Sequence, residues 1–238
     1  MFETVIYAKN GPMAYIILNR SNKINAFNIQ MRDDLYQALE AVRDDPEIRV
    51  AVVSGAGEHG FCAGADLSEF CTSPSQVVAR DVRWERDIWG LMRMVGKPLI
   101  AAVHGHVFGS GVEIACLCDL RVASEDTVFC MPEAALGMVP SAGGTQTLPR
   151  LVGVGRVLDV LLTGRKILPQ EAMRMGLVHS VVTRDELMSE AERLAGCIAA
   201  LDPNAVTAAR TAILNGMDLP LDEGLALERR LVASLLLR

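Results

Sequence analysis

The spacing of apolar residues along the chain predicts a mixed α/β fold. Residues 2–8 and 13–18 have the pattern of two strands, and Asn10-Gly11-Pro12 between them is typical of a hairpin turn. Residues 28–42 carry apolar side chains at helical spacing, after asparagines that can cap a helix. Residues 49–54 (RVAVVS) are mostly apolar and lie between helical patterns, so we expect a buried strand that pairs in parallel.

The same periodicity divides the chain into a core and a helical C-terminal region. A strand, a glycine-rich loop and a helix follow one another twice, over residues 50–67 and 99–118. Residues 146–152 look helical, with a break at Pro149. We expect a core over residues 1–183, which holds the site, and helices alone over 184–238. Those helices are expected at 184–200, about 203–215 and 221–238.

Two acidic residues flank the second glycine-rich turn. Gly109-Ser110-Gly111 opens a helix whose first turn carries Glu113, and Glu133 follows a short β-like segment. Free N–H groups and the helix dipole make such a turn suitable for an oxygen that becomes negative during a reaction. Two acids beside it indicate acid/base chemistry on a polarised carbonyl. Taken alone, however, Glu113 fits a simple partner of the helix dipole, and Pro132-Glu133 fits an ordinary helix start.

The first glycine-rich loop, residues 55–67 (GAGEHGFCAGADL), directly follows a buried strand. Ligands of open α/β sheets bind at this carboxyl end of the strands. The loop lacks the full G-x-G-x-x-G pattern, so it does not predict a dinucleotide site. Two such loops could direct two N–H groups at one oxygen. No metal site is predicted, because His104 and His106 have no carboxylate or cysteine at matching ligand spacing.

Composition and charge narrow the class of protein. The 238 residues are 50% hydrophobic and carry a net charge of −6, with no run of Lys and Arg, which argues against a nucleic-acid surface. The six cysteines form no paired C-x-x-C and most lie in apolar runs, as in a reduced, cytoplasmic protein. We expect no signal peptide and no membrane span, since no apolar run reaches membrane-spanning length.

Several long segments resemble the crotonase superfamily, specifically the enoyl-CoA hydratases. They are SGAGEHGFCAGADL, KPLIAAVHGHVFGSGVEIACLCDLRVAS, FCMPEAALGMVPSAGGTQTLPRLVG and LLTGRKILPQEAMRMGLV, in the family's order and over nearly the whole chain. The resemblance implies an α/β fold, a spiral of ββα units with a C-terminal helical region. It also implies assembly as a homotrimer or as a hexamer of paired trimers.

The resemblance further implies a site and a reaction. The thioester oxygen of a 2-enoyl-CoA would sit between the N–H groups of Ala65 and Ser110, and Glu113 and Glu133 would be the catalytic pair that adds water across C2=C3. Ser110 replaces the family's commoner glycine. Because the contact is made by the backbone, the serine need not abolish it.

Other residues are implied as contacts of the substrate. Coenzyme A is part of that substrate, and neither a metal nor a redox cofactor is expected. Gly143 and Gly144 would shape the pocket wall behind Glu133. The remaining candidates for substrate binding are Lys23, Ala63, Gly64, Asp66, Leu67 and Gly109.

Two alternative functions stay open at this point. The same scaffold supports a Δ3-Δ2 enoyl-CoA isomerase, in which one acid shuttles a proton. A non-catalytic or RNA-associated member is disfavoured by the acidic pI of ≈ 5.3 and by the presence of both acids. Family chains usually continue past a point like Arg238 with another helix and a basic tail, so we expect either a fragment or a more open site.

Overall fold

The strands of the computed structural model, which describes residues 2–69 and 85–237, form two sheets. The larger sheet has the order β1-β2-β3-β5-β7-β9 and the smaller has the order β4-β6-β8. The strands of the larger sheet are β1 (Val5–Asn10), β2 (Met13–Leu18), β3 (Val50–Gly55), β5 (Leu99–Val103), β7 (Leu120–Ser124) and β9 (Ser180–Val182). The strands of the smaller sheet are β4 (Gly60–Cys62), β6 (His106–Phe108) and β8 (Val128–Cys130).

Strand pairing follows the sequence expectation. β1 and β2 form an antiparallel hairpin in which Val5 pairs with Leu18, and the other named pairs are parallel. The consecutive strand pairs β3/β4, β5/β6 and β7/β8 each give their first strand to the larger sheet and their second to the smaller. The chain therefore forms a spiral, and successive turns of this spiral place equivalent loops side by side.

The helices belong to three groups. The helices of the body are α1 (Ile29–Asp44), α3 (Ile88–Met94), α4 (Ser110–Leu117), α5 (Gly144–Val152), α6 (Val154–Thr163), α7 (Pro169–Met175) and α8 (Leu187–Ala199). Short 3₁₀ turns are η1 (Ser21–Lys23), η2 (Leu67–Glu69) and η3 (Glu133–Leu136). The C-terminal pair is α9 (Pro203–Gly216) and α10 (Leu221–Leu236).

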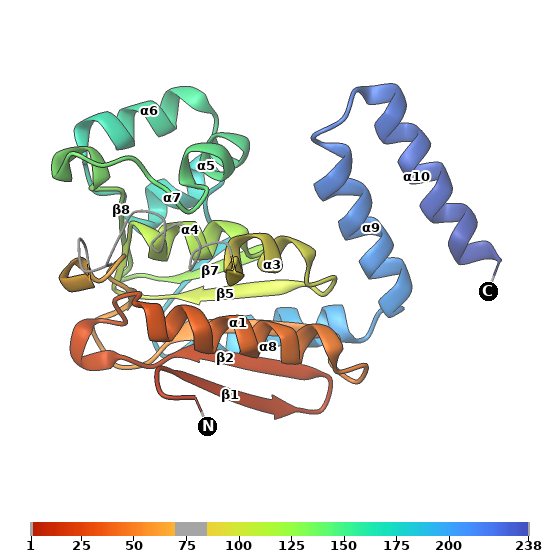
Figure 1. Cartoon of the computed structure of the whole chain (residues 1–238), viewed down its shortest axis with the longest axis horizontal. Coiled ribbons are helices and arrows are strands. Elements are labelled where there is room, and N and C mark those ends of the chain that lie inside the picture. Colours follow the sequence, from red (N-terminus) through yellow and green to blue (C-terminus); the bar gives the residue numbers. More distant parts are fainter. Residues whose placement is uncertain (1, 70–84, 238) are drawn as a thin grey trace.

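Alternate residues of the buried strands face two apolar layers. On β3, Ala51 and Val53 join the cluster that includes α1, α3 and α4, whereas Val50 and Val52 join the cluster that includes α8. In Figure 1, α1 and α8 lie on opposite sides of the sheet. The larger sheet is thus covered on both faces, as expected for mostly parallel strands.

Helix α8 is part of the body, although we expect the helical region to begin near residue 183. Its buried face is made of small residues spaced four apart after Leu187, namely Ala191, Ala195 and Ala199. Small side chains let the helix lie close to the sheet. The change from packed body to projecting helices therefore falls after Ala199.

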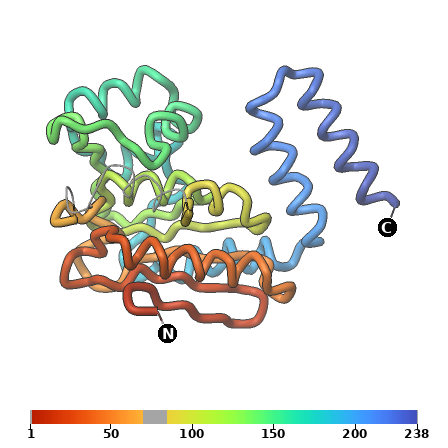
Figure 2. The backbone as a smooth tube through the Cα atoms, in the orientation of Figure 1, coloured from red at the N-terminus to blue at the C-terminus, as the bar shows by residue number. Residues whose placement is uncertain are grey.

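Helices α9 and α10 stand apart from the body as an antiparallel pair, which we call the C-terminal arm (residues 203–236). Figures 1 and 2 show this arm in blue beside the sheets, ending at the C-terminus. Neither helix has a buried residue. Arg210, in the middle of α9, connects the arm to the body by donating from Nε to both carboxylate oxygens of Asp119 at 2.8 and 2.9 Å. At the turn between α9 and α10, Asp218 accepts hydrogen bonds from Arg93 at 3.1 Å and Arg150 at 3.4 Å.

Helix α5 differs from the sequence expectation. The break at Pro149 is wrong, because α5 runs through this residue to Val152. Proline removes one N–H from the helix, but the N–H of Gly153 still donates to the carbonyl of Pro149 at 3.0 Å. The Ser/Thr cluster before Pro74 predicts a mobile loop over the site, but these residues lie outside the described part of the chain. No helix in the described ranges is long and apolar enough to cross a lipid bilayer.

Candidate active site

The two glycine-rich loops meet at Gly64 and Gly109. Both have a positive φ, 96° and 48°. A Cβ added to Gly64 would lie 3.1 Å from the carbonyl oxygen of Phe108, and one added to Gly109 would lie 3.7 Å from the Cα of Gly64. Glycine therefore permits this close backbone approach, and the residues that follow the two glycines are Ala65 and Ser110.

The hydrogen bonds around Ala65 determine where its N–H points. Phe27 pairs with Ala65 in a parallel bridge. The N–H of Phe27 donates to the carbonyl of Gly64, and the N–H of Asp66 donates to the carbonyl of Phe27, both at 2.8 Å. Such a bridge turns the N–H of Ala65 away from Phe27. Ser110 is the first residue of α4, where backbone N–H groups lack intrahelical partners.

Glu113 lies one helical turn after Gly109 and is 2% exposed. Its Oε1 accepts hydrogen bonds from the N–H groups of Ala142 at 2.9 Å and Gly144 at 2.8 Å. Two backbone donors on one carboxylate oxygen stabilise negative charge and fix the side chain. Ala142 is a contributor that the sequence analysis missed, because it lies 29 residues along the chain from Glu113.

The glycine pair at the start of α5 supports Glu113, a contact that the sequence analysis did not predict. A Cβ on Gly144 would lie 2.9 Å from Oε1 of Glu113. Gly143 is the N-cap of α5, with φ of 100°. The sequence alone does not show this contact, because Glu113 and Gly144 lie 31 residues apart in the chain.

Glu133 lies at the start of η3 and is 9% exposed. Its Oε2 is buried and has no hydrogen-bond partner within the described part of the chain. Its Oε1 lies 2.8 Å from where a Cβ of Gly109 would be, so this carboxyl group borders the second glycine-rich loop. A buried polar atom without a partner is costly, and one explanation for it is contact with a ligand.

Burial raises the pKa of Glu133, and the nearby negative charge of Glu113 raises it further. A raised pKa favours the protonated form, which can donate a proton near neutral pH. The two carboxyl groups thus have different environments. Glu113 is held by two N–H donors, whereas Glu133 is removed from solvent. Two carboxyl groups in environments that differ in this way can take the separate roles of base and acid.

The raised pKa of Glu133 predicts a pH-dependent gain of stability in the Glu133→Gln variant. Above the raised pKa, the folded protein must hold an ionised, buried carboxylate, which lowers its stability. This penalty is lost as the pH falls below the ordinary pKa of glutamate, because Glu133 is then protonated in both the folded and the unfolded state. We therefore expect a higher Tm than the parent at neutral pH and equal values in acid.

Thermal unfolding measured across this pH range checks the prediction. Glu125→Gln is the matched control, since Glu125 is exposed. Its Tm should follow the parent at each pH. A Tm for Glu133→Gln at or below that of the parent at neutral pH would contradict the assignment of a desolvated carboxyl group.

The candidate contacts for coenzyme A lie along the first loop. The N–H of Ala63 donates to the carbonyl of Ile24 at 2.9 Å, which places this loop beside exposed Lys23. Asp66 pairs with Arg20 at 2.9 Å, so its carboxylate is engaged by the protein. The remaining candidate on this loop, Leu67, is 54% exposed.

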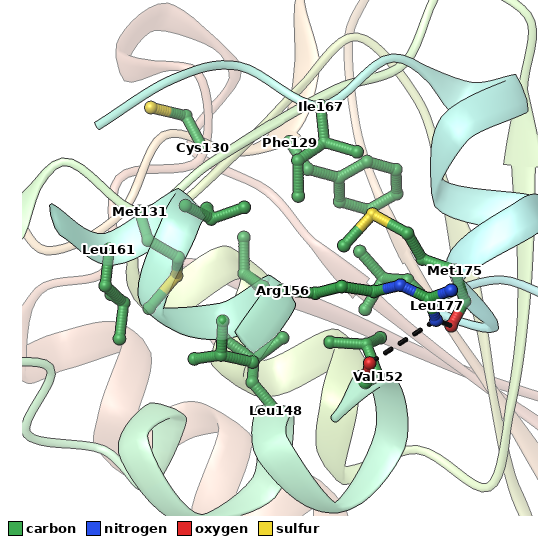
Figure 3. Close-up of a pocket in the computed structure, with 13 residues that line it drawn as sticks. Phe129, Cys130, Met131, Leu148, Val152, Arg156, Leu161, Ile167, Met175 and Leu177 are labelled. Atoms are coloured by element: carbon green, nitrogen blue, oxygen red, sulfur yellow. Dashed lines mark hydrogen bonds between the residues drawn. The ribbon is translucent and has the colours of Figure 1, made fainter. Parts of the chain in front are cut away.

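A small, mostly apolar hollow lies between strand β8 and helices α5, α6 and α7. Figure 3 shows its lining, with the Arg156 guanidinium donating to backbone carbonyls at one side. Its volume is ≈ 10 Å³, which is too small for an acyl chain. Val112 and Met131, which flank the acids in the chain, belong to this lining. The hollow is therefore a small packing gap in the core and not a substrate pocket.

Four buried cysteines and His104 are part of the core. Cys62, Cys116, Cys118 and Cys130 are free and buried. Burial lowers the pKa of His104 to about 4, and its Nε2 contacts the carbonyl of Gly57 at 3.1 Å. Within residues 2–69 and 85–237, no group of three or more His, Cys, Asp or Glu side chains is arranged to hold a metal ion.

Known proteins of one family are similar to this chain over most of its length. The family model described as enoyl-CoA hydratase/isomerase matches residues 8–236. A putative enoyl-CoA hydratase/isomerase of Bacillus subtilis is 38% identical over 231 residues, covering 97% of this chain and 89% of that protein. A crotonyl-CoA hydratase of Syntrophomonas wolfei is 36% identical over 228 residues, covering 95% of this chain and 87% of that protein.

The fold is confirmed by a solved structure. The enoyl-CoA hydratase of Bacillus anthracis superposes with a TM-score of 0.94 at 34% identity, covering 99% of this chain and 92% of that one. The expected crotonase-like α/β fold is therefore correct. The chain belongs to the enoyl-CoA hydratase/isomerase family.

Proposed function

We propose that this protein is an enoyl-CoA hydratase, which adds water across the C2=C3 bond of a 2-enoyl-CoA to give a 3-hydroxyacyl-CoA. The observation that carries the proposal is the pair of buried carboxyl groups, Glu113 and Glu133, beside the meeting point of two glycine-rich loops. Hydration changes no oxidation state overall and needs no redox cofactor. Coenzyme A enters as part of the substrate.

The proposed mechanism uses four groups of this chain. The N–H groups of Ala65 and Ser110 receive the thioester oxygen, which makes Cβ electrophilic. Glu113 takes a proton from water as its oxygen bonds to Cβ, and the C=C electrons move toward the thioester oxygen. Glu133 then gives its proton to Cα, and the C–O double bond re-forms. The proton left on Glu113 passes to Glu133 or to solvent to restore the starting state.

The assignment of acid and base follows the two environments. Glu133 has the raised pKa and the buried, unpartnered Oε2, which suits a proton donor. Glu113 accepts two backbone hydrogen bonds, which suits a carboxylate that begins the cycle ionised. Losing one N–H donor of the oxyanion pair typically costs ~10²–10³ in rate.

A second candidate is the shift of a double bond between C3 and C2 of an enoyl-CoA. It is favoured by the same unpartnered Oε2 of Glu133, because one carboxyl group can carry a proton from one carbon to the other. In that reaction Glu113 would take no part in proton transfer.

The test of the proposed function starts with crotonyl-CoA, which the name of the Syntrophomonas wolfei relative suggests. We expect loss of the enoyl-thioester absorbance on adding the protein, and 3-hydroxybutyryl-CoA as the product by mass spectrometry. A 3-enoyl-CoA supplied in parallel identifies an isomerase, since its conversion to the 2-enoyl isomer adds that absorbance. Absorbance gained from 3-enoyl-CoA with no hydration of any 2-enoyl-CoA would reject the hydratase.

We also propose that copies of this chain assemble through the C-terminal arm, as a homotrimer or as a hexamer. The arm has exposed apolar side chains along both helices and buries none of them within the chain. Surfaces of this kind are covered in oligomers. The most exposed are Ile213, Met217, Leu221 and Leu236.

Light scattering after gel filtration tests the assembly. The parent should have a multiple of the chain mass of 25.7 kDa, and the Ile213→Glu/Met217→Glu double variant should be smaller. Charged side chains in an apolar interface leave unpaired buried charge, which opposes association. A parent that elutes at the mass of one chain would contradict this proposal.

A further inference from the structure

Asn25 is a buried side chain with three hydrogen bonds that the proposed mechanism does not use. It lies between β2 and α1, is 0% exposed and has a left-handed φ of 54°. Its Oδ1 accepts a hydrogen bond from the N–H of Arg20 at 2.9 Å. Its Nδ2 donates to the carbonyl oxygens of Ala56 at 2.9 Å and Gly60 at 3.0 Å.

These two carbonyls belong to opposite ends of one loop. Ala56 follows the last residue of β3, and Gly60 is the first residue of β4. Asn25 therefore fixes the distance between the end of one strand and the start of the next. A Cβ on Gly55 would lie 3.0 Å from Nδ2 of Asn25, so the amide is closely packed there. Strand β4 leads directly into the loop that carries Ala65.

The residues on both sides of Asn25 form backbone hydrogen bonds with the loop that carries Ala65. The carbonyl of Ile24 accepts a hydrogen bond from the N–H of Ala63. Two residues after Asn25, Phe27 makes the bridge that orients Ala65. The backbone on each side of Asn25 is thus paired with a neighbour of Ala65.

The backbone at this position is conformationally restricted. Ile24 has φ of 49°, and a β-branched residue seldom adopts this conformation. Asparagine accepts left-handed φ more readily, and its amide can bond to nearby backbone groups. Strained backbone of this kind persists where the surroundings determine it, and it concentrates at functional sites.

We propose that Asn25 is a positioning residue for the oxyanion site, acting through the backbone of residues 24–27 and 55–66. It holds the N–H of Ala65 in the direction that the thioester oxygen requires. This inference rests on the proposed function, because the oxyanion site is part of it. A displacement of about 1 Å can cost roughly 10²-fold in rate even when the mutated residue lies away from the chemistry.

Two variants test the proposal. Asn25→Gly removes the amide and keeps a residue that adopts positive φ without strain. Asn25→Asp keeps the shape and the acceptor for Arg20 but removes both N–H donors. The matched control is Asp34→Asn, since Asp34 is also buried and its Oδ2 accepts from the N–H of Thr4 at 2.8 Å in a different part of the fold.

The readout is the enolate of bound acetoacetyl-CoA, a β-keto thioester, followed by its ultraviolet absorbance as the pH is varied. The oxyanion site stabilises this enolate and lowers the apparent pKa of the bound ligand. We expect each Asn25 variant to raise that pKa by about one unit, which is a tenfold weaker stabilisation of the enolate. In the crotonyl-CoA assay, kcat should fall by ~10-fold or more, with a smaller change in KM.

The control separates positioning from stability. Asp34→Asn should lower Tm while leaving the pKa of the bound ligand and kcat at parent values. If the Asn25 variants lower Tm alone and keep both parent values, Asn25 is merely structural and the inference is overturned. A parent that stabilises the enolate but does not hydrate 2-enoyl-CoA would reject the hydratase, and the titration would still decide the role of Asn25.

Discussion

Replacing Glu133 with glutamine should lower kcat for hydration by about 10²–10⁴-fold, the usual loss when one acid/base group is removed. Glutamine has nearly the same shape, so the packing around η3 should persist. It cannot deliver a proton to Cα, which is the step that the proposed mechanism assigns to this carboxyl group. Stopped-flow loss of the crotonyl-CoA absorbance, at saturating substrate, measures the effect.

Glu113→Gln serves as the partner experiment because it divides the two candidate reactions. In a hydratase both variants should lose activity to a similar degree, since water must be deprotonated and Cα protonated. In an isomerase only the Glu133 variant should lose activity. Glu125→Gln, with an exposed carboxylate, should keep parent kcat. Parent activity in the Glu133 variant would contradict its role as the acid.

Much of the fold is predictable from local pattern, and the exceptions have physical reasons. The β1–β2 hairpin and the buried strand β3 were correctly predicted because their signals are local: a turn dipeptide and an apolar run. The place of α8 was not predictable, since an alanine-lined face fits either a sheet or a neighbouring helix. The helix packs on β3, β5 and β7, which are distant in the sequence, and the spacing of apolar residues within a helix does not indicate which element it packs on.

The candidate site divides in the same way. Glu113, Glu133 and the two glycine-rich loops stand out in the sequence because residue type and spacing carry the signal. The partners that hold them do not, because an alanine N–H at position 142 or an asparagine at position 25 has no distinctive pattern. Both act across tens of residues, from 29 for Ala142 to 35 for the bond from Asn25 to Gly60. Such contacts are set by the spiral, which brings equivalent loops together.

Gly144→Ala should reduce kcat by about 10²-fold, although it adds one methyl group at a position remote from Cα of the substrate. The new Cβ would lie 2.9 Å from Oε1 of Glu113, 3.0 Å from Cε of Met131 and 3.1 Å from Cβ of Pro140. The methionine end can move, but the carboxylate is held by the N–H of Gly144 itself. The base must therefore turn away from the site or lose that hydrogen bond.

The matched control is Gly155→Ala. Gly155 lies near the start of α6, and a Cβ there meets nothing within 4 Å. Neither glycine has a positive φ, so backbone strain does not distinguish the two variants. Gly155→Ala should keep parent kcat and gain ~0.4–1 kcal/mol of stability.

A comparison of kcat with Tm then shows what Gly144 does. Overpacking a buried site typically costs ~1–3 kcal/mol, so some loss of Tm is expected in Gly144→Ala. Stability alone cannot explain a large loss of kcat measured well below Tm, where the variant remains folded. Parent kcat in Gly144→Ala would show that Glu113 does not depend on the start of α5 for its orientation. A loss shared with Gly155→Ala would instead indicate a general effect of adding a methyl group to a helix.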